Sequence, residues 1–335
     1  MSRYIVGVDL GGTRIRAARF DLDLNLVERV ETLTLAHEGY HPTLERIMAQ
    51  IERVWPAASD EVLGIGVSAP GPVNPTTGVL VLPPNLPGWH EVPLARIIQD
   101  RFGRPTYLGN DANCAVLGEA RKGAAIGYEH VIYITVSTGI GGGIISHGRL
   151  ILGREGLAGE VGHVIISPEA GLRGSVEKLS AGPAIAQEAV LRLQAGAPSS
   201  IRDAVGGDWS KVTAQVVGEA ALAGDPLGIE LIARTGRLVG VLIANLMLLF
   251  NPEIFVVGGG VTHAGDRLFS PMREAVKAYT IDHAFWRGVP IVPAALGDDN
   301  GLIGVAALAL EAETARADCD QSHSSGEVQH GPRAG

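Results

Sequence analysis

Cysteine is scarce in this sequence. The 335 residues include only Cys114 and Cys319, which excludes a disulfide framework and leaves no CxxC pair or Cys/His cluster for a structural zinc ion. This cysteine usage favours a reducing compartment. The N-terminal segment has Asp9 within its first apolar stretch and lacks the apolar core of a secretory signal peptide. We therefore expect a cytoplasmic protein.

Excess positive charge and long apolar runs are also missing. The 36 Asp and Glu residues outnumber the 27 Lys and Arg residues, and the net charge of -9 disfavours binding along a nucleic-acid backbone. The longest apolar run, Leu238 to Phe250, is shorter than the about 20 residues of a membrane span and contains Gly240 and Asn245. We expect a buried helix here, and neither a nucleic acid nor a membrane as partner.

Hydrophobic residues and glycine, by contrast, are abundant. Hydrophobic residues form 46% of the chain, which is enough for large cores, and the length suits about two domains. The 45 glycines are nearly twice the usual share of about 7%. Since glycine clusters mark tight turns or a close approach of the backbone to a ligand, their positions are informative.

Three glycine-rich turns each follow an apolar strand pattern. Gly11-Gly12-Thr13 and Ser137–Gly143 each lead into a second extended segment, and Gly258–Gly260 follows a buried type of strand. No segment matches the P-loop pattern, and the first two turns lack the helix that follows a dinucleotide-binding fingerprint. Phosphate held by backbone N–H groups, with a hydroxyl donor from Thr13 or Thr138, remains as the ligand hypothesis. Plain hairpin turns are the alternative.

The rest of the chain alternates helical and extended patterns, which predicts the α/β class. Helices are expected near 42–54, 93–101, 112–121, 184–193, 209–222, 226–250 and 302–313, and further strands near 62–67, 104–108, 162–166 and 289–292. Toward the C-terminus the composition turns to Asp, Gln, Ser, His and Gly. We expect a flexible tail there.

Seven motifs, in order along the chain, resemble those of the ROK family of bacterial sugar kinases, and of its glucokinases in particular. Each motif is moderately specific, whereas the ordered set, over about residues 4–312, is very specific. The motifs are Asp9–Thr13, Ala69–Val73, Pro84–Trp89, Asn110–Asn113, Ser137–Gly143, Gly159–His163 and Asn251–Gly260.

The resemblance implies a two-domain, actin-like or Hsp70-like ATPase fold with ribonuclease H-like domains and an interdomain cleft for ATP and sugar. We expect a smaller N-terminal domain at 1–122 plus 300–313, a larger C-terminal domain at 123–299, and the tail at 314–335. The implied activity transfers the γ-phosphoryl group of ATP to a hexose, with Mg²⁺ as cofactor and a homodimer as assembly. Glucose is the favoured sugar; fructose, mannose, allose and N-acetylmannosamine, and polyphosphate as donor, stay open.

Asp111 is the candidate general base. A carboxylate within hydrogen-bond reach can accept the proton of a sugar hydroxyl as the bond to phosphorus forms. Its position before the expected helix 112–121 is, taken alone, better explained by helix capping. The resemblance to the family's Asn-Asp-Ala-Asn motif implies the catalytic role instead. It also implies that Asn110 and Asn85 bind sugar hydroxyls.

The resemblance assigns the remaining site residues by motif. Asp9 is expected near the metal, where Mg²⁺ would neutralise phosphate charge. The turns are expected to bind the nucleotide, with the third resembling the adenosine side of an ATP site. Sugar-binding positions of the family are matched by Glu160, His163 and Glu177, and cofactor-binding positions by Asp9, Gly11, Gly12, Thr13, Thr138, Gly139, Gly141, Gly258, Gly259 and Gly260.

The chain departs from the family pattern after His163. Many ROK proteins have three cysteines here in the pattern C-x-C-G-x-x-G-C-x-E, and these bind zinc together with the histidine. In this chain Ser175 stands where the last cysteine would fall, and the loop before it is shorter. We therefore expect no zinc. Glu177 still matches the end of the motif, which leaves open what holds the loop.

Two other functions compete with that of a sugar kinase. A ROK-type transcriptional repressor would have a helix-turn-helix ahead of the first turn, and that turn begins here at residue 9, which disfavours a sugar-sensing regulator. A different actin-like protein, such as an acetate kinase or an ATPase chaperone, is disfavoured by the sugar motifs Pro84–Trp89 and Gly159–His163.

Overall fold

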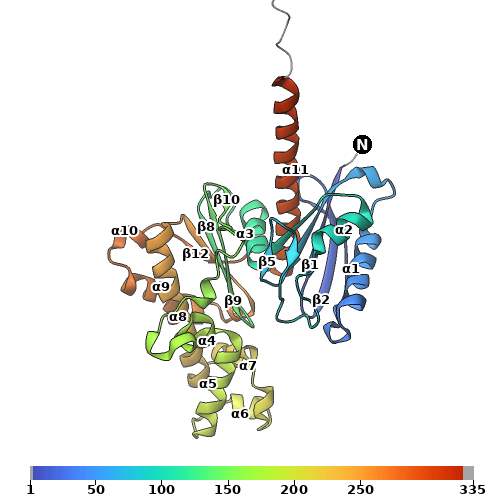
Figure 1. Cartoon of the computed structure of the whole chain (residues 1–335). Helices are drawn as coiled ribbons and strands as arrows, with labels where there is room; N and C mark the ends of the chain where they lie inside the picture. Colours follow the sequence, from blue (N-terminus) through green and yellow to red (C-terminus); the bar gives the residue numbers. More distant parts are fainter. Residues whose placement is uncertain (1–2, 327–335) are drawn as a thin grey trace, which may run out of the picture. The chain divides into compact units, whose positions relative to one another are not determined.

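The computed structural model describes residues 3–326, which form two compact units (Figure 1). Among these residues, unit 1 contains those up to 118, residues 155–157 and those from 299, and unit 2 contains 119–154 and 158–298. Each unit is built on a five-stranded sheet with helices. The α/β class expected from the sequence is confirmed.

The sheet of unit 1 combines antiparallel and parallel pairs in the order β3-β2-β1-β4-β7. β1, β2 and β3 pair antiparallel, whereas β1, β4 and β7 pair parallel. Parallel strands end at the same edge of a sheet, so the segments after β1, β4 and β7 lie together. The strands are β1 (Tyr4–Leu10), β2 (Arg14–Phe20), β3 (Leu26–Leu33), β4 (Val62–Ala69) and β7 (Thr106–Asn110).

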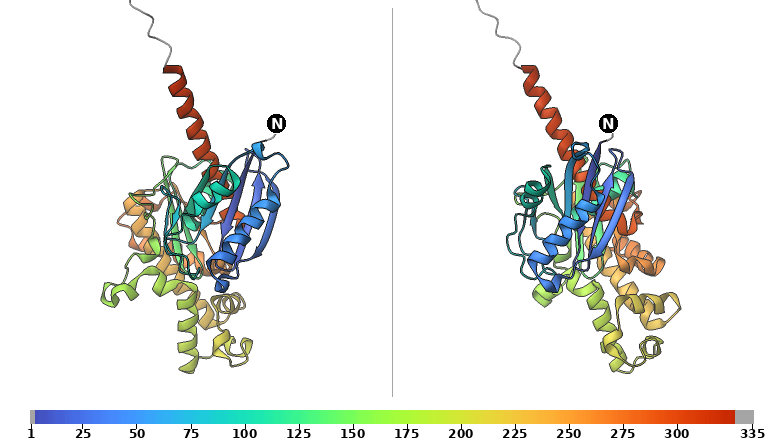
Figure 2. Two further views of the ribbon diagram at one scale, coloured as in Figure 1. Left: turned by 45° about the vertical axis from the view of Figure 1, so that its right-hand side comes forward. Right: turned by 90° about the vertical axis from the view of Figure 1, so that its right-hand side faces the viewer.

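The helices of unit 1 cover this sheet. α1 lies along one face in both views of Figure 2 and buries Ile47, Ile51 and Val54. Trp89 is also buried and makes an edge contact with Tyr40, so it belongs to the core. The other elements are η1 (Ala36–Glu38), α1 (Tyr40–Val54), η2 (Ser59–Glu61), the hairpin β5 (Val73–Asn74) and β6 (Val79–Leu80), α2 (Leu94–Phe102), α3 (Asp111–Lys122), which starts in this unit, and α11 (Asn300–Gly326).

The expected flexible tail at 314–335 is wrong for its first part. α11 continues as one helix to Gly326 and extends beyond the sheet of unit 1 (Figure 1). The segment after residue 310 begins with Ala and Glu residues and has no Pro or Gly before Gly326, so no residue in it removes a backbone N–H donor from the helix. Residues 327–335 lie outside the described residues.

Unit 2 repeats the strand plan of unit 1, in the order β10-β9-β8-β11-β12. β8, β9 and β10 pair antiparallel, and β8, β11 and β12 pair parallel. The glycine-rich turn between β8 and β9 therefore takes the same place in its sheet as the turn between β1 and β2. The strands are β8 (Val131–Val136), β9 (Ile140–Ser146), β10 (Arg149–Leu150), β11 (Ile254–Gly258) and β12 (Ile291–Pro293).

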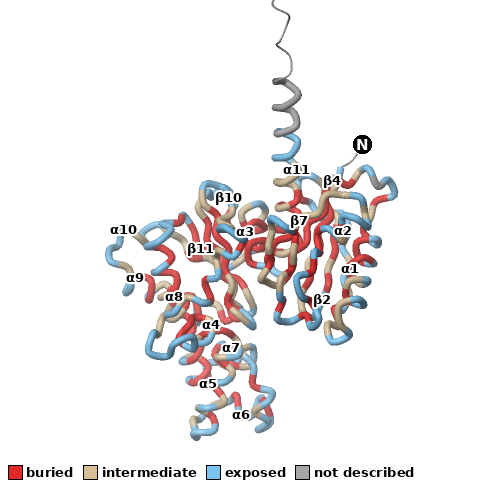
Figure 3. Tube along the Cα trace, viewed as in Figure 1, coloured by how far each residue is buried: buried red, intermediate tan, exposed pale blue. Residues whose placement is uncertain are grey.

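The helices of unit 2 pack around a core that includes the buried strand β11 (Figure 3). They are α4 (Val176–Ser180), α5 (Gly182–Gln194), α6 (Ile201–Ala204), α7 (Ala214–Leu222), α8 (Pro226–Phe250), α9 (Asp266–Tyr279) and α10 (His283–Trp286). Short 3₁₀ segments are η3 (Val161–His163), η4 (Pro168–Gly174), η5 (Trp209–Lys211), η6 (Gly260–Ala264) and, at the boundary with unit 1, η7 (Gly297–Asp299).

α8 is long and apolar enough to cross a membrane by length and composition, but it serves as a core helix. In its most apolar window, 61% of the residues are buried. It crosses α9 very closely, because a side chain at Gly236 or Gly240 would come within 2.4 Å of a backbone oxygen of α9. The buried helix expected at Leu238–Phe250 is present, although residues 248–250 are exposed.

The strand expected at 162–166 is absent from the described structure. Residues 161–163 form the 3₁₀ segment η3, and Ile165 makes only an isolated bridge with Ser175. A short apolar run does not by itself distinguish a strand from a tight loop. Gly162 decides the outcome here, because a side chain on it would lie 2.0 Å from the Ile140 oxygen, so the backbone crosses β9 at close range.

Asp225 joins α8 to the loop before α6, and its loss should destabilise the fold. The buried carboxylate caps α8 by accepting from Gly228 N, and it also accepts from the Ser200 N–H and from the hydroxyls of Ser199 and Ser200. We expect Asp225→Ala to lower the free energy of unfolding by about 2–4 kcal/mol, measured by urea denaturation. Thr213→Ala, which removes the exposed cap of α7, should cost clearly less.

The same carboxylate predicts how stability depends on pH. Burial opposes its ionisation, but the hydrogen bonds from Gly228 and Ser200 outweigh burial and lower the pKa of Asp225. Its contribution is therefore complete above the ordinary Asp pKa of about 3.9 and is lost as the pH falls through the lowered value. Equal losses for the Asp225 and Thr213 variants, or an Asp225→Ala effect that does not shrink in acid, would contradict this assignment.

Candidate functional site

The turn after β1 is rigid and holds Asp9 at the sheet edge. Gly11 N donates to Arg14 O at 2.9 Å, and Thr34 N donates to Thr13 O at 2.8 Å. Asp9 pairs with Ser68 of β4 in the sheet register and forms an ion pair with Arg16 at 3.6 Å. The first predicted cofactor-binding group, Asp9 with Gly11, Gly12 and Thr13, is thus brought together in one turn.

Asn85 lies against this turn. A side chain on Gly12 would come within 3.0 Å of Asn85 Cβ, so glycine is needed for the loop to approach so closely. Asn85 itself is exposed, and its neighbours Leu86 and Trp89 are buried and anchor the loop. A predicted sugar-binding residue therefore sits directly beside a predicted phosphate turn, although they are 73 positions apart in the sequence.

The sequence left two roles open for Asp111, helix cap and general base. In the structure the capping role belongs to its neighbour Asn110. Asn110, at the end of β7, accepts from Asn113 N at 2.7 Å and so caps α3. Asp111 is the first residue of α3, where its Oδ1 accepts from Ala112 N at 2.8 Å while the side chain stays exposed. Since Asn110 provides the cap, capping no longer explains why an aspartate stands at 111. Ala69 pairs with Asn110 in the register, so both residues share the edge with Asp9.

The electrostatics of Asp9 suit a divalent cation. Burial raises the pKa of its carboxyl, while Arg16 and the hydroxyl of Ser68 oppose that rise. A carboxylate that has lost solvation gains from a hard cation, and carboxylate oxygen is a ligand that Mg²⁺ prefers. The N-terminus of α11 also comes close, because a side chain on Gly301 would lie 3.1 Å from Asp9 Oδ1.

In unit 2, the turn between β8 and β9 is tied to two other segments. Ser137 N donates to Gly139 O at 2.9 Å, and Gly182 N, at the start of α5, donates to Ser137 O at 2.8 Å. Glu177 Oε2 accepts from Ile140 N at 3.1 Å. A side chain on Gly139 would lie 2.7 Å from that same carboxylate oxygen. Glu177, predicted to bind sugar, is thus placed on the predicted phosphate turn; Gly141 lies two residues past the turn, opposite Thr135.

The third glycine segment packs against the second turn. Gly258 pairs with Thr135 in the register, and Gly259 has a φ of +90°. A side chain on Gly259 would meet Val136 O at 2.4 Å. Only glycine suits this position, since both the backbone angle and the close approach exclude a side chain. Thr262 closes the turn by donating its hydroxyl to Gly259 O at 2.7 Å.

These two turns open onto a cavity of about 760 Å³ within unit 2. A volume of this size suits a drug-sized ligand such as a nucleoside. Its wall is mostly apolar, with hydroxyl and imidazole groups from Thr138, Thr213 and His263. The residues around it include Ser137, Thr138, Gly182, Pro183, Thr213, Gly218, Ile232, Gly260, Val261 and His263.

Sequence reasoning missed most of this wall. Gly182-Pro183 at the start of α5 was a usable signal, because Pro is favoured in the first turn of a helix and helix N-termini attract anions. The N-cap residue of this helix is Ala181, whose methyl side chain cannot accept a hydrogen bond from the first backbone N–H groups. Gly218 of α7 and Ile232 of α8 also line the cavity. Nothing in the sequence marks them as site residues, because the apolar residues of these two helices have the spacing of ordinary core helices.

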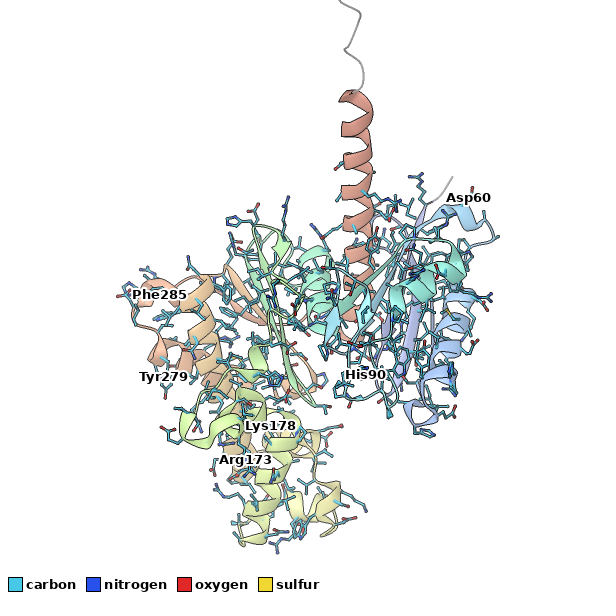
Figure 4. All side chains as sticks on the ribbon, in the orientation of Figure 1. Asp60, His90, Arg173, Lys178, Tyr279 and Phe285 are labelled. Carbon is cyan, nitrogen blue, oxygen red and sulfur yellow. The ribbon has the colours of Figure 1, made fainter. Side chains whose placement is uncertain are left out.

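Glu160 and His163 lie together on η3 and its cap, both exposed, with His163 Nε2 4.0 Å from Glu160 Oε2. Their spacing of three residues places them on the same side of this short turn. The structure thus brings Glu160 and His163 together. The Glu177 carboxylate lies instead against the turn at Gly139. Lys178 lies 3.6 Å from the second oxygen of Glu177 and projects from α4 (Figure 4).

Backbone hydrogen bonds hold the loop that lacks cysteines. Ile166 N donates to Gly174 O at 2.9 Å, and Val176 N donates to Val164 O at 3.0 Å. Gly174 allows its backbone to pack directly against Ser167, since a side chain at Gly174 would lie 1.9 Å from Ser167 O. Ser175 is buried and caps α4 by accepting from Lys178 N. This arrangement answers what positions Glu177 in a loop without the cysteine pattern.

Comparison with known proteins matches this arrangement to one family. The ROK family model matches residues 5–312. The chain belongs to the ROK family. The glucokinase of Thermotoga maritima is 34% identical over 92% of the chain and 97% of that enzyme. The sequence assignment to this family is thereby confirmed.

Solved structures of the family superpose closely. A ROK family glucokinase from Streptomyces griseus, in complex with glucose and AMPPNP, has a TM-score of 0.79 and 31% identity, covering 92% of this chain and 99% of that one. The ROK hexokinase from Thermus thermophilus has a TM-score of 0.79 and 36% identity, covering 93% and 99%. The expected two-domain, actin-like ATPase fold is confirmed by these neighbours.

Proposed function

We propose that this ROK protein is an ATP-dependent, glucokinase-like hexose kinase that converts glucose and ATP to glucose 6-phosphate and ADP. It is a phosphotransferase with an alcohol group as acceptor, like its glucokinase relatives. The observation that carries the proposal is the cavity of unit 2, which is lined by Ser137, Thr138 and Gly260 of the two glycine turns, in a chain 31% identical to a glucokinase solved with glucose and AMPPNP.

Each group of residues has a role that its geometry supports. Asp111, exposed at the start of α3, accepts the proton of the attacking sugar hydroxyl. Asn85 and the amide NH₂ of Asn110 donate to other hydroxyls, and Glu160, His163 and Glu177 are further sugar-binding residues. Backbone N–H groups of the turns Gly11–Thr13 and Thr138–Gly141, other than those of Gly11 and Ile140, which donate to Arg14 O and Glu177, bind phosphate oxygens and stabilise the charge of the transition state. Gly258–Gly260 faces the nucleoside.

Asp9 would hold Mg²⁺, directly or through water or phosphate. When bound, Mg²⁺ neutralises charge that spreads over the phosphate oxygens. Strand β1 places Asp9 at the sheet edge, where its carboxylate forms an ion pair with Arg16. The nucleoside cavity also has polar side chains in its wall, which include Thr138, Thr213, Gln215, Glu219 and His263.

A coupled assay of ADP release with a panel of hexoses tests the function. We expect the highest kcat/KM with glucose among glucose, fructose, mannose, allose and N-acetylmannosamine, with ATP preferred to polyphosphate. A missing or inverted hydroxyl leaves polar groups of the site unpaired, so discrimination of at least about tenfold is expected. A higher kcat/KM with another sugar would replace glucose as substrate. No ADP release with any sugar would overturn the kinase assignment.

Replacing Asp9 by asparagine should stabilise the ligand-free protein and lower its activity. The folded-state pKa of Asp9 is raised, so its ionised form costs stability at neutral pH, and this cost is absent below the ordinary value of about 3.9. We expect Asp9→Asn to raise the Tm of the ligand-free protein at pH 7 and to lower kcat at least about tenfold at saturating Mg²⁺. Calorimetry and steady-state kinetics measure the two effects.

The exposed Asp23 provides the control for this prediction. Asp23→Asn should change neither Tm nor kcat. An Asp9→Asn protein with a lower Tm would mean that the pair with Arg16 outweighs burial. Unchanged kcat would remove Asp9 from the site.

We also propose that catalysis needs no zinc, because the loop from Val164 to Val176 is held by backbone hydrogen bonds. Treatment with a zinc-selective chelator, with Mg²⁺ replenished, should leave kcat and the KM for glucose within about twofold. The matched control is a ROK kinase that has the three cysteines, which should lose activity. Loss of activity that added zinc restores would reject the proposal for this chain.

The proposed activity also bears on the compartment, the partners and the assembly of the enzyme. We propose a cytoplasmic enzyme, where ATP and free sugar are available and where Cys114 stays a buried free thiol. We further propose a homodimer, with sugar and nucleotide as the other partners and no nucleic acid or membrane. Sedimentation of the purified chain, with a dimer mass expected, tests the assembly.

A further inference from the structure

Glu129, His130 and His147 form a cluster apart from the residues assigned to the kinase reaction. Each offers one ligand atom, and these three atoms all lie within 4.8 Å of one another. His130 directly precedes β8 and His147 directly follows β9. The cluster therefore stands at the end of the hairpin opposite the turn Ser137–Gly139. Six residues of β8 separate the two ends, which is about 20 Å.

The two imidazoles are held in fixed positions. Their ring centroids lie 4.5 Å apart with planes at 75°. His130 Nδ1 is 3.2 Å from the hydroxyl of Ser146, and this hydrogen bond restrains the orientation of the ring. A hydrogen bond at one ring nitrogen that leaves the other for a metal is the usual arrangement of metal-binding histidines.

The backbone that carries the ligands is also fixed. Gly148 N donates to Glu129 O at 2.9 Å, which ties the turn after β9 to the segment before β8. Glu253 accepts from the backbone N–H groups of Glu129 and His130, at 2.7 and 2.9 Å. The Glu253 carboxylate therefore lies beside the cluster and adds an acidic group next to the three ligands.

The turn after β9 has a histidine at a position where asparagine would be favoured. His147 and Gly148 have φ values of +51° and +69°, which is the two-residue hairpin turn that Asn-Gly favours most strongly. Positive φ is uncommon for residues other than glycine, and histidine, like asparagine, adopts it more often than most. An imidazole at this position faces the imidazole of His130, which asparagine could not replace as a nitrogen ligand.

We propose that Glu129, His130 and His147 bind one divalent transition metal ion, with zinc as the representative case. Two imidazole nitrogens and one carboxylate oxygen are a ligand set that suits Zn²⁺, Cu²⁺ or Ni²⁺ rather than Mg²⁺. Three protein ligands leave a fourth position for water. The ion would join the ends of β8 and β9, so it acts on the stability of unit 2 and not on phosphoryl transfer. This site differs from the family's cysteine site and involves none of its residues.

The test uses the full chain, free of any affinity tag and stripped of metal. Isothermal titration with ZnCl₂ should give one site per chain, and added Zn²⁺ should raise the Tm. His147→Asn is the decisive variant, because asparagine accepts the same backbone angles and keeps the turn while it removes the imidazole. We expect it to weaken Zn²⁺ binding at least about 100-fold and to abolish the rise in Tm.

Two histidine variants serve as controls. His90 is a single exposed histidine 4.0 Å from Glu91 (labelled in Figure 4), and His163 has the similar neighbour Glu160. His90→Asn and His163→Asn should bind Zn²⁺ like the parent chain. Binding lost in His163→Asn and kept in His147→Asn would overturn the proposal, as would equally weak binding by all four proteins. Activity in the hexose assay is expected to be unaffected by His147→Asn, so this result is independent of the kinase assignment.

Discussion

Replacing Asp111 by asparagine is expected to lower kcat by about 10²–10⁴-fold, which corresponds to about 2.7–5.5 kcal/mol of transition-state stabilisation. Asparagine cannot accept the sugar proton, but its Oδ1 can still accept from Ala112 N as Asp111 does at 2.8 Å. The start of α3 and its cap at Asn110 should therefore be unchanged. Because asparagine still forms hydrogen bonds with hydroxyls, the affinity for glucose should be largely kept.

Steady-state kinetics and calorimetry with glucose separate these two expectations. The matched control is Asp100→Asn, which changes an exposed aspartate paired with Arg96 on α2, and it should leave kcat unchanged. A folded Asp111→Asn enzyme with near-normal kcat would remove Asp111 as the base. A large rise in KM with unchanged kcat would assign it to binding alone.

Replacing Gly260 by valine should weaken ATP binding about 100-fold while leaving the fold intact. Gly260 lines the cavity of unit 2, and nothing lies within 4 Å of where its side chain would begin. Its backbone angle is an ordinary one, so valine adds no strain. The added side chain would take up space that the nucleotide needs. A loss of 100-fold is about 2.7 kcal/mol of binding free energy.

Gly259 shows why Gly260 is the informative position. At Gly259 a side chain would meet Val136 O at 2.4 Å at a φ of +90°, so a substitution there would disturb the fold itself. Ala223→Val introduces the same final side chain at an exposed helix end, at a residue that does not line the cavity, and should affect neither ATP affinity nor Tm. Unchanged ATP affinity in a folded Gly260→Val protein would reject the cavity as the nucleotide site.

Local sequence patterns predicted the elements where a strong local rule applies. Glycine between two apolar extended segments predicted the hairpins β1–β2 and β8–β9, and the helical pattern at 226–250 predicted α8. Patterns failed where a close contact decided the conformation. At 162–166 the approach of Gly162 to Ile140 O replaced the expected strand by η3. After residue 313 the polar composition suggested a tail, but the segment has no Pro or Gly before Gly326, and α11 continued.

The sequence by itself determined the α/β class, the ROK family and the identity of the candidate residues, because these depend on residue types in a fixed order. Only the tertiary structure decided which of them meet. It placed Asn85 on Gly12 and Glu177 on Gly139, gave the capping role to Asn110 instead of Asp111, and formed the cavity with residues of α5, α7 and α8. Such contacts join segments far apart in the chain, and their geometry depends on strand register and on packing distances that no local pattern contains.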